Sequence, residues 1–212
     1  MDLTYNPGIF EVSSIPEAMQ IILTPDGAST ADRWAKETPY FAELIGQSLA
    51  ITAGSVLLDY GCGLGRLAKA LIARHGCRVI GVDISPSMRA LAVSYVASDH
   101  FFTCPPGMLD VLSERGMTVD AAISVWVLQH CLRPAEDIAR IRRVLKPGGR
   151  CFVINNVDRW VPTVEQGWVN DGVEIRTLLE RHFTLEEDGQ LAQESANQTI
   201  ANIAFWAKFI RD

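Results

Sequence analysis

From Ser55 to Asn155, short runs of apolar residues alternate with longer segments in which apolar residues recur every three or four positions. The short runs predict strands buried on both faces, and the longer repeat predicts helices that pack on them. The expected strands are residues 55–60, 78–83, 100–104, 119–126 and 150–155, with helices after the first, second and fourth of them. Residues 104–117 indicate no more than one short helical turn. This alternation is typical of a parallel sheet with helices on both faces.

The N-terminal part of the chain departs from this alternation. Residues up to 50 predict a separate helical segment. Thr38 and Pro39 suit an N-cap and a first helical turn, and the residues that follow repeat at helical spacing. The apolar positions of that repeat are Phe41, Leu44, Ile45 and Leu49. We therefore expect residues 1–50 to form a helical extension or lid.

The C-terminal part differs as well. A helix is expected over residues 174–182, and residues 183–189 and 200–210 then predict two strands. No helix-length segment separates these strands, so they are expected to pair antiparallel. Together the patterns predict a doubly wound, mostly parallel α/β fold in which residues 51–212 form one folding unit.

Composition limits the class of protein. Five cysteines, an odd number with no C-x-x-C pair, indicate neither a disulfide framework nor a metal site, and they favour a reducing, cytoplasmic compartment. No apolar run approaches the roughly 20 residues of a membrane-spanning helix, and the N-terminus has no secretory signal pattern. The net charge of −6 opposes attachment to nucleic acid, which needs clustered Lys and Arg. A small-molecule partner is therefore expected, and a nucleic acid or a protein is the less favoured alternative.

A glycine-rich turn is the main candidate for chemistry. The sequence D-Y-G-C-G-L-G, from Asp59 to Gly65, lies where a strand is expected to turn into a helix. Glycines at such a turn let the backbone approach a ligand that a Cβ atom would exclude. Asp83 ends the next strand about 20 residues later, where a carboxylate can accept both hydroxyls of a ribose. A nucleotide site is favoured over the alternative, a tight turn with Asp83 as a helix cap.

Two details separate the possible nucleotides. A dinucleotide fingerprint reads G-x-G-x-x-G, whereas here the third glycine, Gly65, comes one residue early and Arg66 takes the expected place. A dinucleotide fold built from two βαβαβ halves would also close on a parallel strand, whereas this chain is expected to close on an antiparallel one. Both details disfavour NAD.

Four segments in order, VLLDYGCGLG, VIGVD, VDAAISVWVLQH and RRVLKPGG, resemble the motifs of the class I methyltransferases that depend on S-adenosylmethionine (SAM). The similarity is greatest to the small UbiE-like and methyltransferase-11-like members and covers about residues 50–210. It implies a seven-stranded sheet with an antiparallel last strand. It also implies that Asp59 and the backbone at Gly61, Cys62 and Gly63 hold the methionine part of SAM.

The resemblance assigns the rest of the cofactor too. It implies that Asp83 takes the ribose, that Ile84 and Met88 pack on the adenine, and that Val125 lines the floor near the sulfonium. The chain departs from the family pattern at residues 104–105, where Cys-Pro replaces an Asp followed by a small residue. The usual contact to the adenine amino group is therefore in doubt.

The acceptor end of the site is less defined. Methyl transfer needs chiefly an aligned acceptor, and a general base only if the nucleophile arrives protonated. His130 is the one histidine that the motif order places at the carboxyl edge of the sheet, so it is our candidate base. The alternative is a loop histidine hydrogen-bonded to backbone near the cofactor.

Several aromatic residues are candidates for the wall of the acceptor pocket. Trp126 ends the fourth expected strand, and Trp160 and Trp168 lie in the loop after the fifth. Trp34 and Tyr5 could cover the site from the N-terminal segment. For each of them the alternative is a partly buried packing role. The chain is thus predicted to methylate an oxygen, nitrogen or carbon of a small molecule. A non-catalytic SAM-binding or regulatory subunit stays open as an alternative, and an NAD-linked oxidoreductase is the weaker one.

Overall fold

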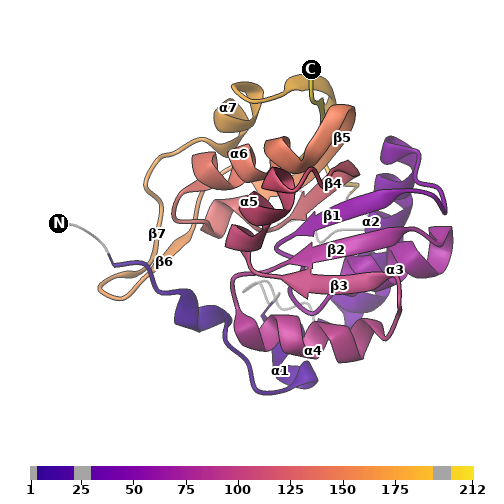
Figure 1. Ribbon diagram of the computed structural model, residues 1–212. Helices are drawn as coiled ribbons and strands as arrows, with labels where there is room; N and C mark the ends of the chain where they lie inside the picture. Colours follow the sequence, from indigo (N-terminus) through magenta and orange to yellow (C-terminus); the bar gives the residue numbers. More distant parts are fainter. Residues whose placement is uncertain (1–3, 22–29, 193–201) are drawn as a thin grey trace.

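A computed structural model describes residues 4–21, 30–192 and 202–212. Seven strands form one sheet in the order β3-β2-β1-β4-β5-β9-β8 (Figure 1). They are β1 (Val56–Tyr60), β2 (Arg78–Val82), β3 (Phe101–Cys104), β4 (Val119–Val125), β5 (Leu145–Asn156), β8 (Thr184–Gly189) and β9 (Ala204–Ile210). β9, the last strand in the chain, is antiparallel to both of its neighbours. The prediction of a mostly parallel seven-stranded sheet with an antiparallel last strand is confirmed.

Helices cover both faces of this sheet (Figure 1). One face packs against α2 (Thr30–Leu49), α3 (Arg66–His75) and α4 (Pro86–Val96), and the other against α5 (Pro106–Glu114), α6 (Pro134–Val144) and α7 (Ile175–Glu180). Two separate clusters of fully buried side chains result, one around Phe41 and Leu71 and the other around Ile138 and Leu179. Each helix contributes its apolar stripe to one cluster, as an amphipathic helix on a buried sheet must.

The helix α2 begins earlier than the sequence predicted. It runs from Thr30, so Pro39 lies inside the helix and Thr38 does not cap it. An internal proline removes one backbone hydrogen bond, yet the helix continues because side chains on both sides of it are buried. Trp34 packs with α4, and Phe41 and Ile45 are fully buried in the core. Tertiary packing therefore outweighs the local signal of the Thr-Pro pair.

The segment between β3 and β4 also differs from its prediction. In place of one turn, α5 forms a helix of nine residues that starts at Pro106. Proline is tolerated there because the first N–H groups of a helix have no partner within the helix. Leu109 is fully buried against the sheet, which holds the helix in place.

The N-terminal segment lies against a hairpin that follows β5. This hairpin consists of β6 (Val161–Thr163) and β7 (Gly167–Val169), and the N-terminal segment contains η1 (Pro7–Phe10) and α1 (Ile15–Gln20). Tyr5 forms an antiparallel bridge with Thr163, next to a hydrogen bond of 2.9 Å from the Asn6 N–H to the Pro162 carbonyl. Figure 1 shows the start of the chain beside this hairpin. Among the described helices, none has both the length and the hydropathy needed to cross a bilayer.

Candidate functional site

A cavity of about 1110 Å³ opens at the carboxyl edge of the parallel strands. Ligands of open α/β sheets bind at this edge, because the loops that leave the strands converge there. The N-terminal segment and the β6–β7 hairpin complete the wall through Tyr5, Phe10 and Trp168. All but one of the residues predicted for the site line this cavity: Tyr5, Asp59, Gly61, Cys62, Gly63, Asp83, Ile84, Met88, Val125, Trp126, His130, Trp160 and Trp168.

Two glycines of the turn after β1, Gly61 and Gly63, are needed for different physical reasons. A Cβ atom at Gly61 would lie 2.1 Å from the Val127 side chain, so this glycine permits close packing. Gly63 has a φ of +51°, and a Cβ atom there would meet nothing within 4 Å. Because Gly63 also lines the cavity, its bare backbone faces open space that a side chain would fill. The turn is thus held by packing at one glycine and kept open for a ligand at the other.

Asp83 connects this turn to the end of β2. Its carboxylate accepts a hydrogen bond from the Gly63 N–H (2.8 Å) and another from the Ser85 N–H (2.9 Å). The cap of α4 is Ser85, whose hydroxyl accepts from the Met88 N–H (3.1 Å). Burial raises the pKa of Asp83, and its two backbone donors oppose that rise. Asp83 is therefore not the cap of α4, and its carboxylate instead orients the glycine turn from the end of the next strand.

Asp59 is the second carboxylate of the site. Its side chain is on β1 and the residue is only 3% exposed. Burial raises its pKa to about 7, the nearby charge of Asp83 adds to the rise, and Arg66 opposes it. Arg66, the first residue of α3, also lines the cavity and is 3.6 Å from the carboxylate of Glu37. The site thus holds a buried carboxyl group whose ionised form is costly unless a positive ligand group compensates it.

His130 is held in one tautomer by its neighbours. Its Nδ1 lies 2.6 Å from the Trp160 carbonyl, which only accepts, so Nδ1 carries the proton. Its Nε2 lies 3.2 Å from Nε2 of Gln129. Gln129 presents that nitrogen because its Oε1 accepts from the Asn156 N–H at 2.7 Å. Burial lowers the pKa of His130, so the imidazole is neutral at pH 7 with its lone pair on Nε2.

Two interpretations of His130 came from the sequence, a general base and a loop histidine bonded to backbone, and this geometry agrees in part with both. The contact with the Trp160 carbonyl is the backbone hydrogen bond that the structural alternative expected. The histidine nevertheless lines the cavity, with an acceptor nitrogen that a base needs. Because Gln129 already donates to that nitrogen, a ligand hydroxyl must replace the amide before His130 takes a proton.

Trp126 directly follows β4 and has an unusual backbone conformation. Its φ is +62°, in the left-handed region that bulky residues rarely adopt, and its N–H donates to the Ile154 carbonyl at 2.8 Å. The ring lines the cavity and packs at a tilt against Phe41, 6.4 Å between centroids. Backbone strain of this kind is held in place by surrounding contacts and is frequent at functional sites.

Trp34 is the predicted site residue that does not line the cavity. Its ring meets Tyr95 edge to face at 5.7 Å, and the guanidinium of Arg66 lies 5.5 Å from its centroid. The physical reason is that α2 packs in the helical layer formed with α3 and α4, where the Trp34 ring contacts residues of both of those helices. In this structure Trp34 therefore contacts Arg66, which lines the cavity, and does not itself line it.

Several residues of the cavity wall were missed by the sequence interpretation, among them Arg66, Gln129 and Phe10. Arg66 follows the glycine turn directly, and Gln129 precedes His130. Both could have been predicted to line the site from their position next to residues already assigned to it. Phe10 had no such local signal, because it reaches the cavity only through the pairing of residues 4–6 with the hairpin. Its ring centroid is 6.1 Å from that of His130.

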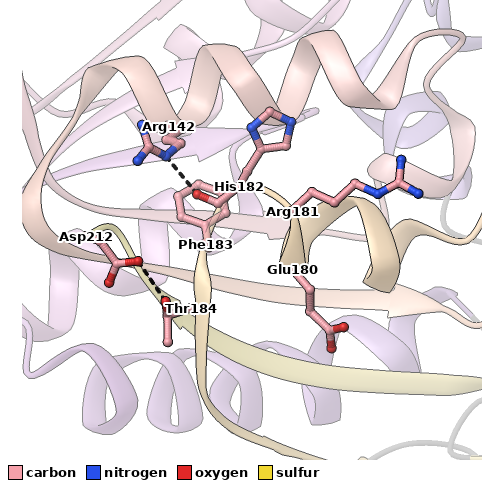
Figure 2. A pocket seen from close by; sticks show the side chains of 7 residues that line it. All are labelled: Arg142, Glu180, Arg181, His182, Phe183, Thr184 and Asp212. Carbon is pink, nitrogen blue, oxygen red and sulfur yellow. Dashed lines mark hydrogen bonds between the residues drawn. The ribbon is translucent and has the colours of Figure 1, made fainter.

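A second, smaller cleft of about 290 Å³ lies at the opposite edge of the sheet, where β8 begins (Figure 2). Figure 2 shows Arg142 donating to the His182 carbonyl (2.7 Å) and Thr184 donating to Asp212 (2.8 Å). The lining residues are Arg142, Glu180, Arg181, His182, Phe183, Thr184 and Asp212. None of the residues predicted for the site lies here, and both hydrogen bonds drawn in Figure 2 join residues of its own lining.

Residues 58–153 match the family model described as a methyltransferase domain. A ubiquinone biosynthesis O-methyltransferase of Xylella fastidiosa (strain 9a5c) is 34% identical over 106 residues, which are 48% of this chain and 42% of that protein. A SAM-dependent Diels-Alderase of Talaromyces variabilis is 34% identical over 116 residues, which are 52% of this chain and 39% of that protein. The aligned segment thus spans less than half the length of these curated relatives.

A solved structure shares the fold over nearly the whole chain. The N-methyltransferase NodS of Bradyrhizobium japonicum WM9, in complex with S-adenosylhomocysteine, superimposes with a TM-score of 0.65 at 20% identity. The superposition covers 92% of this chain and 96% of that one.

Proposed function

We propose that this chain is a class I SAM-dependent methyltransferase, as the methyltransferase-domain match over residues 58–153 supports, and that it transfers a methyl group from SAM to a small molecule. The observation that carries this proposal is the junction of the glycine turn with Asp83. The Gly63 N–H bonds to the Asp83 carboxylate, beside the open space in front of Gly63. A ligand with a ribose and an amino-acid part matches that pair of features.

The residues around this junction fit the cofactor. Asp59 would accept hydrogen bonds from the amino group of its methionine part, and a positive group there offsets the cost of the buried carboxylate. Asp83 would accept from the ribose hydroxyls, and Ile84 and Met88 would pack on the adenine. When bound, SAM supplies a methyl group on a sulfonium sulfur, which is already a good leaving group. The protein then has to align the acceptor and exclude water.

We assign His130 the role of base for an acceptor that arrives protonated. In its neutral tautomer Nε2 is the atom that takes the proton, while Nδ1 stays bonded to the Trp160 carbonyl. That carbonyl also stabilises the imidazolium, because its hydrogen bond strengthens when the ring becomes positive. The acceptor hydroxyl reaches Nε2 by displacing the Gln129 amide.

A second candidate function is SAM binding without methyl transfer. One specific observation favours keeping it, since a relative of equal identity is named a SAM-dependent Diels-Alderase. In such a protein the cavity would shape a substrate without passing on the methyl group. An NAD-linked oxidoreductase is disfavoured by the glycine spacing and by the antiparallel β9.

Calorimetry and thermal unfolding with SAM, S-adenosylhomocysteine and NAD test the cofactor. We expect both adenosyl ligands to bind and to raise the melting temperature, and NAD to do neither. A screen of small acceptors, followed by mass spectrometry of the products, then tests methyl transfer. Stabilisation by NAD alone would overturn the proposal. Tight SAM binding with substrate conversion but no methylated product would favour the second candidate.

A further inference from the structure

We propose that the acceptor is an uncharged, flat aromatic molecule that packs on the rings of Phe10, His130 and Trp168. This inference rests on the proposed function and names the substrate class of the same cavity. Two observations support it. These rings lie against one another, and each described cation that lines the cavity is paired with a carboxylate.

The three rings form one continuous surface, here called the aromatic wall. The ring centroids of Phe10 and His130 are 6.1 Å apart, those of His130 and Trp168 are 5.1 Å apart, and those of Phe10 and Trp168 are 6.3 Å apart. All three line the cavity, and Trp168 is still 43% exposed. Rings that touch one another leave no slot between them, so a ligand must lie against the wall. A flat aromatic ring can cover most of such a surface. It also gains the stacking or edge-to-face energy that aromatic pairs have beyond simple burial of area.

The aromatic wall is held by pairing between distant parts of the chain. The Asn6 N–H donates to the Pro162 carbonyl, and the Val164 N–H donates to the Thr4 carbonyl, each at 2.9 Å. The Tyr5 hydroxyl donates to the His130 carbonyl at 3.3 Å. These bonds fix the N-terminal segment to the hairpin that carries Trp168. The wall is therefore preorganised, which lowers the ordering cost of binding.

The charges of the cavity disfavour an anionic acceptor. Among the described residues three cations line it, and each has a carboxylate partner. Arg66 lies 3.6 Å from Glu37, and Arg133 lies 3.4 Å from Glu136. Arg140 lies 3.1 Å from both Asp110 and Asp137. A carboxylate or phosphate on the acceptor would meet only cations whose charge a carboxylate already offsets, so it would gain less there than at an unpaired arginine.

A cationic acceptor is disfavoured as well. Aromatic faces attract cations, but this wall includes a histidine and lies in the cavity that also takes the positive sulfonium. Two like charges in a buried space repel each other, and a protonated amine has no lone pair to receive a methyl group. The polar groups near the wall, Gln129 and His130, form neutral hydrogen bonds. A neutral ring with a hydroxyl or an uncharged amino group meets all of these conditions.

The experiment is calorimetry on the full chain saturated with S-adenosylhomocysteine. Four probes are titrated: 2-naphthol, 2-naphthoate, 2-(aminomethyl)naphthalene and decahydro-2-naphthol. We expect 2-naphthol to bind at least about tenfold more tightly than each of the charged or saturated analogues. Trp168→Ala and Phe10→Ala should each weaken 2-naphthol about tenfold, whereas Trp168→Phe should stay within about threefold.

Phe102→Ala is the matched control, because Phe102 is 48% exposed on β3 and does not line the cavity. It should leave all four affinities unchanged, and every variant should keep its affinity for S-adenosylhomocysteine. The inference is overturned if a charged or saturated probe binds as tightly as 2-naphthol. It is also overturned if 2-naphthol does not bind up to its solubility limit, or if both alanine variants bind it normally. Failure of the wild type to bind S-adenosylhomocysteine would instead overturn the proposed function.

Discussion

Replacement of Asp59 by asparagine tests whether this buried carboxyl group is kept for the ligand at the expense of stability. Asp59 is 3% exposed, and burial is the main reason that its pKa rises from 3.8 to about 7. Between these two values the folded protein holds a proton that the unfolded chain has released. Stability therefore falls as pH rises from about 4 to 7, and the full cost is present above pH 7.

The size of the effect follows from the same shift. A rise from 3.8 to about 7 makes the ionised group on the order of 4 kcal/mol less favourable in the folded protein than in water. An asparagine removes that cost but leaves an amide N–H without a partner, which costs about 1–3 kcal/mol. Asp59→Asn should thus stabilise the ligand-free protein at pH 8 by about 1–3 kcal/mol. For a chain of this length the melting temperature should rise by about 2–12 °C.

The assay is thermal unfolding from pH 4 to pH 8, with and without S-adenosylhomocysteine. The advantage of the variant should be absent at pH 4 and should grow up to pH 7. The ligand at 100 times its Kd should add about 2.7 kcal/mol to the wild type and little to the variant.

Asp120→Asn is the matched control, and its expected change in stability has the opposite sign to that of Asp59→Asn. Lys146 and the Val56 N–H lower the pKa of Asp120 against the cost of burial, so this variant should lose stability at pH 8. If Asp59→Asn is no more stable than the wild type at any pH, or binds the ligand normally, the reasoning about Asp59 is refuted.

The remaining predictions concern the other residues of the site. Asp83→Ala should abolish SAM binding and also destabilise the fold by about 2–4 kcal/mol, because two backbone N–H groups lose a charged acceptor; calorimetry and urea unfolding measure both losses. Gly63→Val should fold but not bind SAM, since its side chain would enter the cavity; normal affinity would place the site elsewhere. His130→Ala should lower turnover by roughly 10² while SAM affinity holds. The wild-type rate should fall only below pH 6.5, because burial lowers the pKa of His130. A His130→Ala variant with the wild-type turnover would show that His130 is not the base.

Local patterns in the sequence were sufficient for the sheet and for the cofactor end of the cavity. The apolar runs predicted β1, β2 and β4 to within one residue at each end. A strand buried on both faces consists of a nearly continuous run of apolar residues, so its ends can be read from the sequence. The turn from Asp59 to Gly65 and the position of Asp83 followed from the same alternation, since the ends of neighbouring parallel strands meet at one edge. These features depend on residues that are close in sequence.

The acceptor end depended on contacts that no local pattern encodes. The Tyr5 hydroxyl and the His130 carbonyl are 125 residues apart in sequence, and their hydrogen bond helps to fix Phe10 against the ring of His130. Trp34 does not line the cavity, because its ring packs edge to face on Tyr95 of α4, a contact that no local pattern shows. The pKa of Asp59 is likewise a product of burial, which the complete fold alone creates. The sequence by itself determined most of the elements and the meeting of the glycine turn with Asp83 at one edge of the sheet, because these follow from periodicity and from backbone sterics. The tertiary structure decided which side chains face the cavity and which charges are neutralised, because both depend on segments brought together only by folding.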